Sequence, residues 1–305
     1  MNHIKVAIAD EQKRIEKIRS GKCDAFGLKT GLPKLDRILW GLRNGMYYLL
    51  AARPGIGKTT LALNVIENVT LQEKKCCLFI SLEMTQTQIV IRVACNLTGI
   101  DGSTYNDLCG LTDGQLECIN RVFDKVAESD FHIEDNANFT TADIWRMAKQ
   151  MKKDGKLDLV VIDQITFMTP IERASSRAAE VSAISRQMKI LGKDLDIPVL
   201  ALTQLNRDTE KNDRKPILSD LRDSGSLEQD ADVVIFLHPT TSVYEPTYDL
   251  DIIIAKNRHG AKAMIKANMN GAIYQIKEYP DENKKPPKPR QTEMTPVPNA
   301  ELPWD

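Results

Sequence analysis

Short runs of apolar residues alternate with longer amphipathic segments along most of this chain. The apolar runs are typical of strands buried on both faces of a sheet. The segments between them repeat apolar positions every three or four residues, as helices packed on a sheet do. The expected strands are 46–51, 76–81, 131–133, 157–163 and 197–202, and the expected helices are 85–98, 112–128, 140–153 and 178–195.

Three later strand patterns follow one another without a helical pattern between them, at 232–237, 250–256 and 262–268. A basic segment, 256–260, reads as a hairpin turn between the last two, and such closely spaced strands pair antiparallel. We therefore expect an α/β fold with a mostly parallel central sheet flanked by helices, and antiparallel strands near the C-terminus.

The two ends of the chain have different patterns. Residues 2–20 predict a helix with isoleucines near one face, which is expected to dock on another surface; a partly frayed N-terminus is the alternative. From Tyr279 onward the chain holds half of its prolines and predicts a flexible tail. Its last residues, Glu301–Asp305, form an acidic-aromatic tip that is either a short docking peptide or a featureless end. The predicted domains are 1–26, 27–278 and 279–305.

Composition narrows the class of protein. Lys and Arg number 41 against 42 Asp and Glu, so no overall basic field draws the chain to nucleic acid, and such binding requires local patches. The six cysteines contain no C-x-x-C pair. No apolar run approaches the roughly 20 residues that span a bilayer, and we expect a soluble, cytoplasmic protein.

Residues 52–60, Ala-Arg-Pro-Gly-Ile-Gly-Lys-Thr-Thr, lie between a buried strand pattern and a helical one. This context makes a phosphate-binding loop credible, although Ala52 replaces the first glycine of the pattern. The loop and the following helix would bind ATP through backbone N–H groups, Lys58 would reach the β- and γ-phosphates, and Thr59 would ligate Mg²⁺. A chance Gly-Lys-Thr in an ordinary turn is the alternative. The expected nucleotide-binding residues of the loop are Gly55, Gly57, Lys58, Thr59 and Thr60.

Three polar residues lie at or just past the carboxyl ends of expected strands, where α/β sheets place their chemistry. Glu83 is either a general base for the attacking water or a charge at a helix N-terminus. Asp163 is either part of the Mg²⁺ shell or an exposed residue at a strand end. Gln204 either hydrogen-bonds the γ-phosphate or ties down a loop.

Several ordered motifs together resemble the RecA-like ATPase core of the DnaB-type replicative DNA helicases over roughly residues 27–276. Beside the phosphate loop, the resemblance rests on Ser-Leu-Glu-Met at 81–84, Val-Ile-Asp at 161–163 and Ala-Leu-Thr-Gln-Leu-Asn-Arg at 201–207. The block Ser-Asp-Leu-Arg-Asp-Ser-Gly-Ser-Leu-Glu-Gln-Asp-Ala-Asp at 219–232 is close to a signature of that family.

The resemblance implies a role for each matching residue. It implies that Glu83 is the catalytic carboxylate, Gln204 the sensor of the γ-phosphate and Arg92 a nucleotide contact. It also implies an arginine finger that enters the neighbouring subunit's site, formed by Lys256 and Arg258 with Asn257 and Gly260. The single-stranded DNA contacts that it implies are Arg222, Asp223 and Gly225.

As a whole, the resemblance implies a ring, expected to be a hexamer, that moves 5′ to 3′ on single-stranded DNA and unwinds duplex DNA during replication. A helicase loader is a further expected partner. Only the segment 2–20 precedes the core, which leaves a primase partner in doubt. The competing hypotheses are a RecA-like ATPase that acts in recombination or remodelling without unwinding, and a docking module whose ATP site only stabilises the fold.

Overall fold

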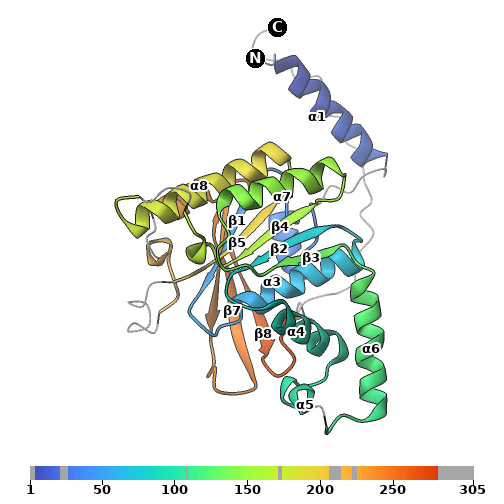
Figure 1. Ribbon diagram of the computed structural model, residues 1–305. Helices are drawn as coiled ribbons and strands as arrows, with labels where there is room; N and C mark the ends of the chain where they lie inside the picture. The colour runs from blue at the N-terminus through green and yellow to red at the C-terminus, as the bar shows by residue number, and fades with distance from the viewer. Residues whose placement is uncertain are drawn as a thin grey trace, which may run out of the picture.

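A nine-stranded sheet forms the centre of the computed structural model, which describes residues 4–20, 27–107, 109–170, 174–205, 214–221 and 225–280 (Figure 1). The strand order is β3-β2-β4-β5-β1-β6-β7-β8-β9. Strands β3 to β6 in that order are parallel to their neighbours, and β6 to β9 are antiparallel. The strands are β1 (Tyr47–Ala52), β2 (Cys77–Ser81), β3 (Phe131–Glu134), β4 (Leu159–Asp163), β5 (Val199–Gln204), β6 (Val233–Pro239), β7 (Thr247–Asn257), β8 (Ala263–Asn270) and β9 (Gln275–Glu278).

Helices cover both faces of this sheet (Figure 1). Helices α7 and α8 lie together on one face, and α3 and α4 lie on the other. The α-helices are α1 (Ile4–Arg19), α2 (Pro33–Leu39), α3 (Lys58–Glu67), α4 (Gln86–Thr98), α5 (Gly102–Asn106), α6 (Asp113–Ala127), α7 (Thr141–Lys153), α8 (Arg177–Leu195) and α9 (Gly225–Asp230). A π-helical segment, η1 (Asn68–Gln72), continues α3, and the 3-10 turns are η2 (Ile165–Phe167) and η4 (Leu218–Asp220).

Alternation along the central strand divides the core into two layers. Tyr48 and Leu50 of β1 join the cluster that α3 and α4 cover, whereas Tyr47 and Leu49 join the cluster under α7 and α8. Successive side chains of a strand point to opposite faces, so a strand buried on both sides must be apolar throughout. This is why the apolar runs of the sequence predicted β1, β2, β4 and β5, and the expected α/β fold is confirmed.

Capping boxes fix where three of the helices begin. Thr85, Thr112 and Thr140 each accept a hydrogen bond from the backbone N–H three residues on, and the side chain at that position bonds back to the threonine N–H. Each cap satisfies two backbone N–H groups that a helix start otherwise leaves unpaired. The expected helices 85–98, 112–128 and 140–153 therefore start within one residue of the observed ones.

The sequence missed the short elements α2, α5, η1, α9 and β9, and it placed β5 too early. The expected strand 197–202 begins at Val199, because the N–H of Ile197 still donates to the Gly192 carbonyl at 3.1 Å and closes the end of α8. The shift is useful to the site, since it makes Gln204 the last residue of the strand.

Helix α1 lies within the predicted segment 2–20 and stands apart from the body of the molecule (Figure 1). The exposed fractions of its apolar residues are high, at 66% for Ile4, 50% for Ile8 and 45% for Ile15. An apolar stripe left in solvent usually marks a surface that another molecule covers. None of the helices in the described ranges is long and apolar enough to cross a membrane.

Candidate nucleotide-binding site

The phosphate loop follows β1 directly and ends where α3 begins. Gly55 and Gly57 have φ angles of 77° and 95°, a left-handed conformation that side chains with a β-carbon rarely adopt. Ala52 instead ends β1 in extended conformation and is fully buried, so its β-carbon is tolerated at the position where the motif usually has glycine. The loop therefore turns the chain from the sheet edge into a helix N-terminus, which is a geometry that binds phosphate.

The other candidate residues reach the same place because the strands that carry them are parallel. The carboxyl ends of β1, β2, β4 and β5 lie at one edge of the sheet, as the register of these strands requires. A cavity of about 440 Å³ opens there. Its lining includes the predicted residues Gly55, Gly57, Lys58, Thr59, Thr60, Glu83, Arg92 and Gln204.

Asp163 is the last residue of β4 and lies buried beneath Thr59 of the phosphate loop. The Thr59 hydroxyl donates to its Oδ2 at 2.6 Å, across 104 residues of sequence. Its Oδ1 is buried and has no hydrogen-bond partner among the described residues. An unpaired buried carboxylate oxygen beside a hydroxyl is a pair of hard oxygen ligands, so the residues present fit Mg²⁺.

The charged side chains of the site influence the pKa values of Lys58 and Asp163. Burial lowers the pKa of the Lys58 ammonium, and the carboxylates of Asp163 and Glu83 oppose that shift. Burial also raises the pKa of the Asp163 carboxyl; Glu83 adds to the increase, while the Thr59 hydroxyl, Lys58 and Arg92 oppose it. The two carboxylates, Glu83 and Asp163, and the two cations, Lys58 and Arg92, are thus close enough to interact electrostatically. Groups that surround a triphosphate and its metal ion must do the same.

One wall of the cavity was not predicted from the sequence. Tyr274, in the turn between β8 and β9, lies under the Arg92 guanidinium, whose carbon is 5.0 Å from the ring centroid. The Asn64 amide of α3 donates to the Tyr274 carbonyl at 3.1 Å, and its Oδ1 accepts from the Ile276 N–H at 2.8 Å. A single tyrosine in a turn about 200 residues from the phosphate loop gives no sequence signal. Other lining residues that were missed are Met84, Val243, Glu245, Tyr248 and Met269.

Lys256 and Arg258 do not line this cavity. Lys256 donates to the backbone carbonyl of Glu228 and Arg258 donates to that of Gln229, both in α9. Arg258 also lies 3.5 Å from Asp232, whose other carboxylate oxygen accepts from the Tyr47 N–H at the start of β1. The phosphate loop follows the opposite end of β1, six residues on. At about 3.3 Å per residue, Arg258 lies roughly 20 Å from the loop, which is too far to serve its own chain's nucleotide.

The structure describes some of the remaining predicted residues, and others lie outside the described ranges. Asn257 shapes the turn after β7, since its amide donates to the Ala261 carbonyl at 3.2 Å and its Oδ1 accepts from the His259 N–H at 3.2 Å. Gly260 lies in the same turn. Of the predicted DNA contacts, Gly225 is exposed at the start of α9, and Arg222 and Asp223 lie outside the described residues.

The sheet order, the phosphate loop after β1 and the polar residues at neighbouring strand ends define a RecA-like nucleotide-binding core. A KaiC-like protein from Pyrococcus horikoshii shares the fold, with a TM-score of 0.56 at 21% identity over 84% of this chain and 100% of that one. The family model for the DnaB-like helicase C-terminal domain matches residues 27–278. The chain belongs to this family.

Individual relatives agree with that assignment. The replicative DNA helicase DnaB of Leifsonia xyli subsp. xyli is 35% identical over 278 residues, which cover 87% of this chain and 58% of the relative. The replicative DNA helicase DnaC of Bacillus subtilis is 33% identical, covering 85% of this chain and 58% of that protein. This chain thus spans a little over half the length of these two curated relatives. The solved structure of a DnaB-like replicative helicase superposes with a TM-score of 0.79 at 28% identity, over 91% of this chain and 67% of that one.

Proposed function

We propose that this chain is the motor of an ATP-driven DNA helicase that forms a ring, moves 5′ to 3′ on single-stranded DNA and unwinds duplex DNA during replication. The observation that carries the proposal is a division of the active site. Lys58 and Glu83 line one cavity, and Asp163 lies behind its lining residue Thr59, whereas Arg258 lies at the opposite edge of the sheet. Such a chain needs a second copy to complete its site, and a ring supplies one to every subunit.

The predicted catalytic residues each have a part in hydrolysis. Lys58 and the loop N–H groups hold the β- and γ-phosphates, and Gln204 hydrogen-bonds the γ-phosphate. Thr59 and Asp163 would hold Mg²⁺, which neutralises charge on the phosphates when bound. Glu83 accepts a proton from the attacking water as general base. Arg258 of the neighbouring subunit stabilises the charge of the transferring phosphoryl group.

Helix α1 would join the subunits of the ring. An apolar groove of about 190 Å³ lies between α4 and α6, and Val90 at its edge is 37% exposed. The stripe of Ile4, Ile8 and Ile15 on α1 is exposed as well. We infer that α1 of one copy lies in this groove on the next, because burying both apolar surfaces removes them from water. The lining of the groove includes Ile89, Val90, Val93, Val122, Phe123, Val126 and Phe131.

DNA would pass through the centre of the ring. The segment 222–225 would contact the phosphates, and each subunit repeats this small patch, so a chain with a formal charge of −1 can still line a basic channel. The segment leads into α9, whose carbonyls hold Lys256 and Arg258. This connection offers a physical route by which DNA contact alters the position of the arginine finger.

A forked duplex with a 5′ single-stranded tail tests the proposal. We expect MgATP-dependent strand displacement by the native chain. Glu83→Gln should lower turnover by roughly 10²–10⁴-fold, the range for loss of a general base, and retain ATP binding. Glu117→Gln, on the exposed face of α6, is the matched control. DNA-stimulated hydrolysis without displacement would instead identify a RecA-like remodelling ATPase.

A further inference from the structure

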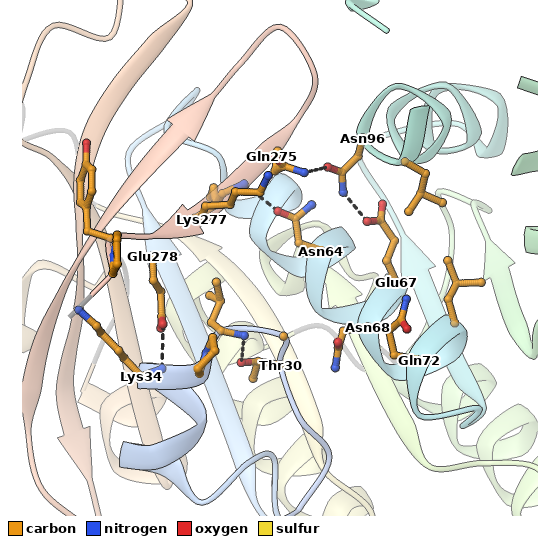
Figure 2. Close-up of a pocket in the computed structure, with 18 of the residues that line it drawn as sticks. Thr30, Lys34, Asn64, Glu67, Asn68, Gln72, Asn96, Gln275, Lys277 and Glu278 are labelled. Carbon is orange, nitrogen blue, oxygen red and sulfur yellow. Dashed lines mark hydrogen bonds between the residues drawn. The ribbon is translucent and has the colours of Figure 1, made fainter. Parts of the chain in front are cut away.

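A second pocket lies between α2, α3, α4 and β9, outside the nucleotide cavity (Figure 2). Its volume is about 610 Å³, within the range of sites that bind small molecules or peptide side chains. Carboxamides form much of its polar lining, and apolar residues form the rest. The carboxamides are Asn64, Asn68, Gln72, Asn96 and Gln275, and the apolar residues include Leu32, Pro33, Leu71, Leu97, Ile276 and Tyr279.

Hydrogen bonds hold one wall of this pocket in place. Figure 2 shows a chain that runs from Gln275 of β9 through Asn96 of α4 to Glu67 of α3. Gln275 donates to Asn96 at 2.9 Å, and Asn96 donates to the Glu67 carboxyl group. A wall fixed by bonds among three elements is preorganised, so a ligand does not have to order it on binding.

The charge balance of the pocket is positive at neutral pH. Lys34, Arg37 and Lys277 are among its lining residues, and Lys277 is exposed. Of the two carboxyl groups, Glu278 accepts the Lys34 and Leu35 N–H groups at the start of α2, at 2.8 and 2.9 Å. Burial raises the pKa of Glu67 to about 8, opposed by the Asn96 hydrogen bond, so this carboxyl is mostly neutral. The pocket therefore attracts an acidic ligand.

Two large apolar side chains of the pocket's lining are exposed. Leu97 is 36% exposed at the end of α4, and Tyr279 is 40% exposed after β9. The Tyr279 hydroxyl donates to Asp249, which fixes the position of the ring. Basic groups beside an exposed leucine, prolines and an aromatic ring suit a peptide that combines carboxylates with an aromatic side chain.

The chain contains such a peptide, and it follows directly from the rim of the pocket. Pro280 lines the pocket, and residues 281–305 continue the sequence from there. From 291 onward the sequence has three carboxylates and no lysine or arginine, and it reaches Glu-Leu-Pro-Trp-Asp at 301–305. We propose that this pocket is a docking site for an acidic-aromatic peptide, and that its occupant is the chain's own segment Glu301–Asp305.

Geometry permits this occupant. Trp304 follows Pro280 by 24 positions, which span roughly 80 Å when fully extended, so the segment can return to the pocket from which it starts. A linker of this length gives an effective concentration in roughly the millimolar range, so weak contacts suffice within one chain. The docked tip would cover the exposed Leu97 and Tyr279.

The test measures binding of a fluorescein-labelled peptide, residues 291–305, to the chain of residues 1–305 by fluorescence anisotropy. The receptor carries Trp304→Ala, so that its own tip does not compete. We expect the peptide to bind this receptor, and to bind the native chain more weakly because the native tip occupies the pocket. A peptide with Trp304→Ala should bind at least roughly ten-fold more weakly, as loss of a central aromatic anchor does.

Charge reversal in the pocket provides the decisive comparison. Lys277→Glu in the receptor should weaken binding by roughly ten-fold, whereas Lys149→Glu, on the exposed face of α7, should leave binding unchanged. Both lysines are exposed, so the melting temperature and ATP binding of each variant check its fold. Equal affinity of the two variants, or no binding to the Trp304→Ala receptor, overturns the proposal. Neither result depends on helicase activity.

Discussion

Asp163 and Glu67 are both buried carboxyl groups, but the structure gives them different surroundings. Asp163 has Lys58 and Arg92 nearby and lies where a metal ion and phosphates would bind, so its burial belongs to the nucleotide site. Glu67 is 7% exposed at the end of α3, and its Oε1 has no hydrogen-bond partner among the described residues. A buried carboxyl with one bonded oxygen is more stable protonated than ionised.

This difference predicts a pH-dependent stability that originates at Glu67. Its pKa rises from 4.5 to about 8 in the folded chain, so between these values the folded state holds a proton that the unfolded state has lost. The contribution of Glu67 to stability is therefore fully present below pH 4.5 and falls by up to about 1.4 kcal/mol per pH unit as pH rises towards 8. Glu67→Gln should flatten this decline, as urea unfolding across that pH range would reveal.

Glu117→Gln is the control, because Glu117 is exposed on α6 and should keep the native pH profile. Parallel profiles for the native chain and Glu67→Gln would show that Glu67 ionises freely in the fold. The sequence could not have given this behaviour, since burial at position 67 arises only when α4 packs beside α3 and brings Asn96 to it.

At the scale of elements, the turn between β8 and β9 is part of the nucleotide site although it follows the phosphate loop by more than 200 residues. Asn64 of α3 ties this turn to the helix that starts at Lys58. Arg92 of α4 lies over the Tyr274 ring on the other side. Three elements thus form one wall, and a change in the turn should alter nucleotide affinity without touching the catalytic residues.

Tyr274→Ala tests this coupling. Cation–π contacts contribute about 0.5–2 kcal/mol, so we expect affinity for a fluorescent ATP analogue to fall by roughly ten-fold while turnover at saturation changes less. Tyr274→Phe keeps the ring and should bind as the native chain does. A native affinity in the alanine variant would mean that the wall does not contact the nucleotide.

At the scale of the whole molecule, the sheet separates Arg258 from its own phosphate loop. Subunits with Lys58→Ala cannot hold the triphosphate but still present Arg258, and subunits with Arg258→Ala hold it but lack the finger. Each variant alone should be nearly inactive, because an arginine finger contributes roughly 10³–10⁵-fold in rate in related enzymes. Mixed before assembly, they should regain activity at interfaces that combine an intact loop with an intact finger.

Random mixing in equal amounts places about a quarter of the interfaces in that combination, so steady-state ATPase of the mixture has a defined ceiling. A mixture as inactive as its components would exclude a shared site. Full activity of isolated single subunits would do so too. A mixture of the native chain with Lys58→Ala subunits controls for dilution. Because Lys58→Ala subunits still present Arg258, each native loop keeps an intact finger beside it, and no new kind of active interface forms.

Much of the fold followed from the sequence because its signals are local. Apolar runs predicted the parallel strands, apolar positions every three or four residues predicted the longer helices, and the phosphate-loop motif predicted the turn between β1 and α3. Glu83, Asp163 and Gln204 could be predicted because parallel strands bring their carboxyl ends to one edge. The short elements α5, α9 and β9 were missed, since a few residues carry too little periodicity.

The sequence by itself determined the α/β alternation, the phosphate loop and which polar residues end the strands, because hydrophobic period and turn chemistry act over a few neighbouring positions. Only the tertiary structure decided that Tyr274 lines the nucleotide cavity and that Glu67 is buried in a carboxamide-lined pocket. It also decided that Arg258 lies far from the phosphate loop of its own chain. These facts depend on which distant segments pack together, and that is settled by burial and register across the whole sheet.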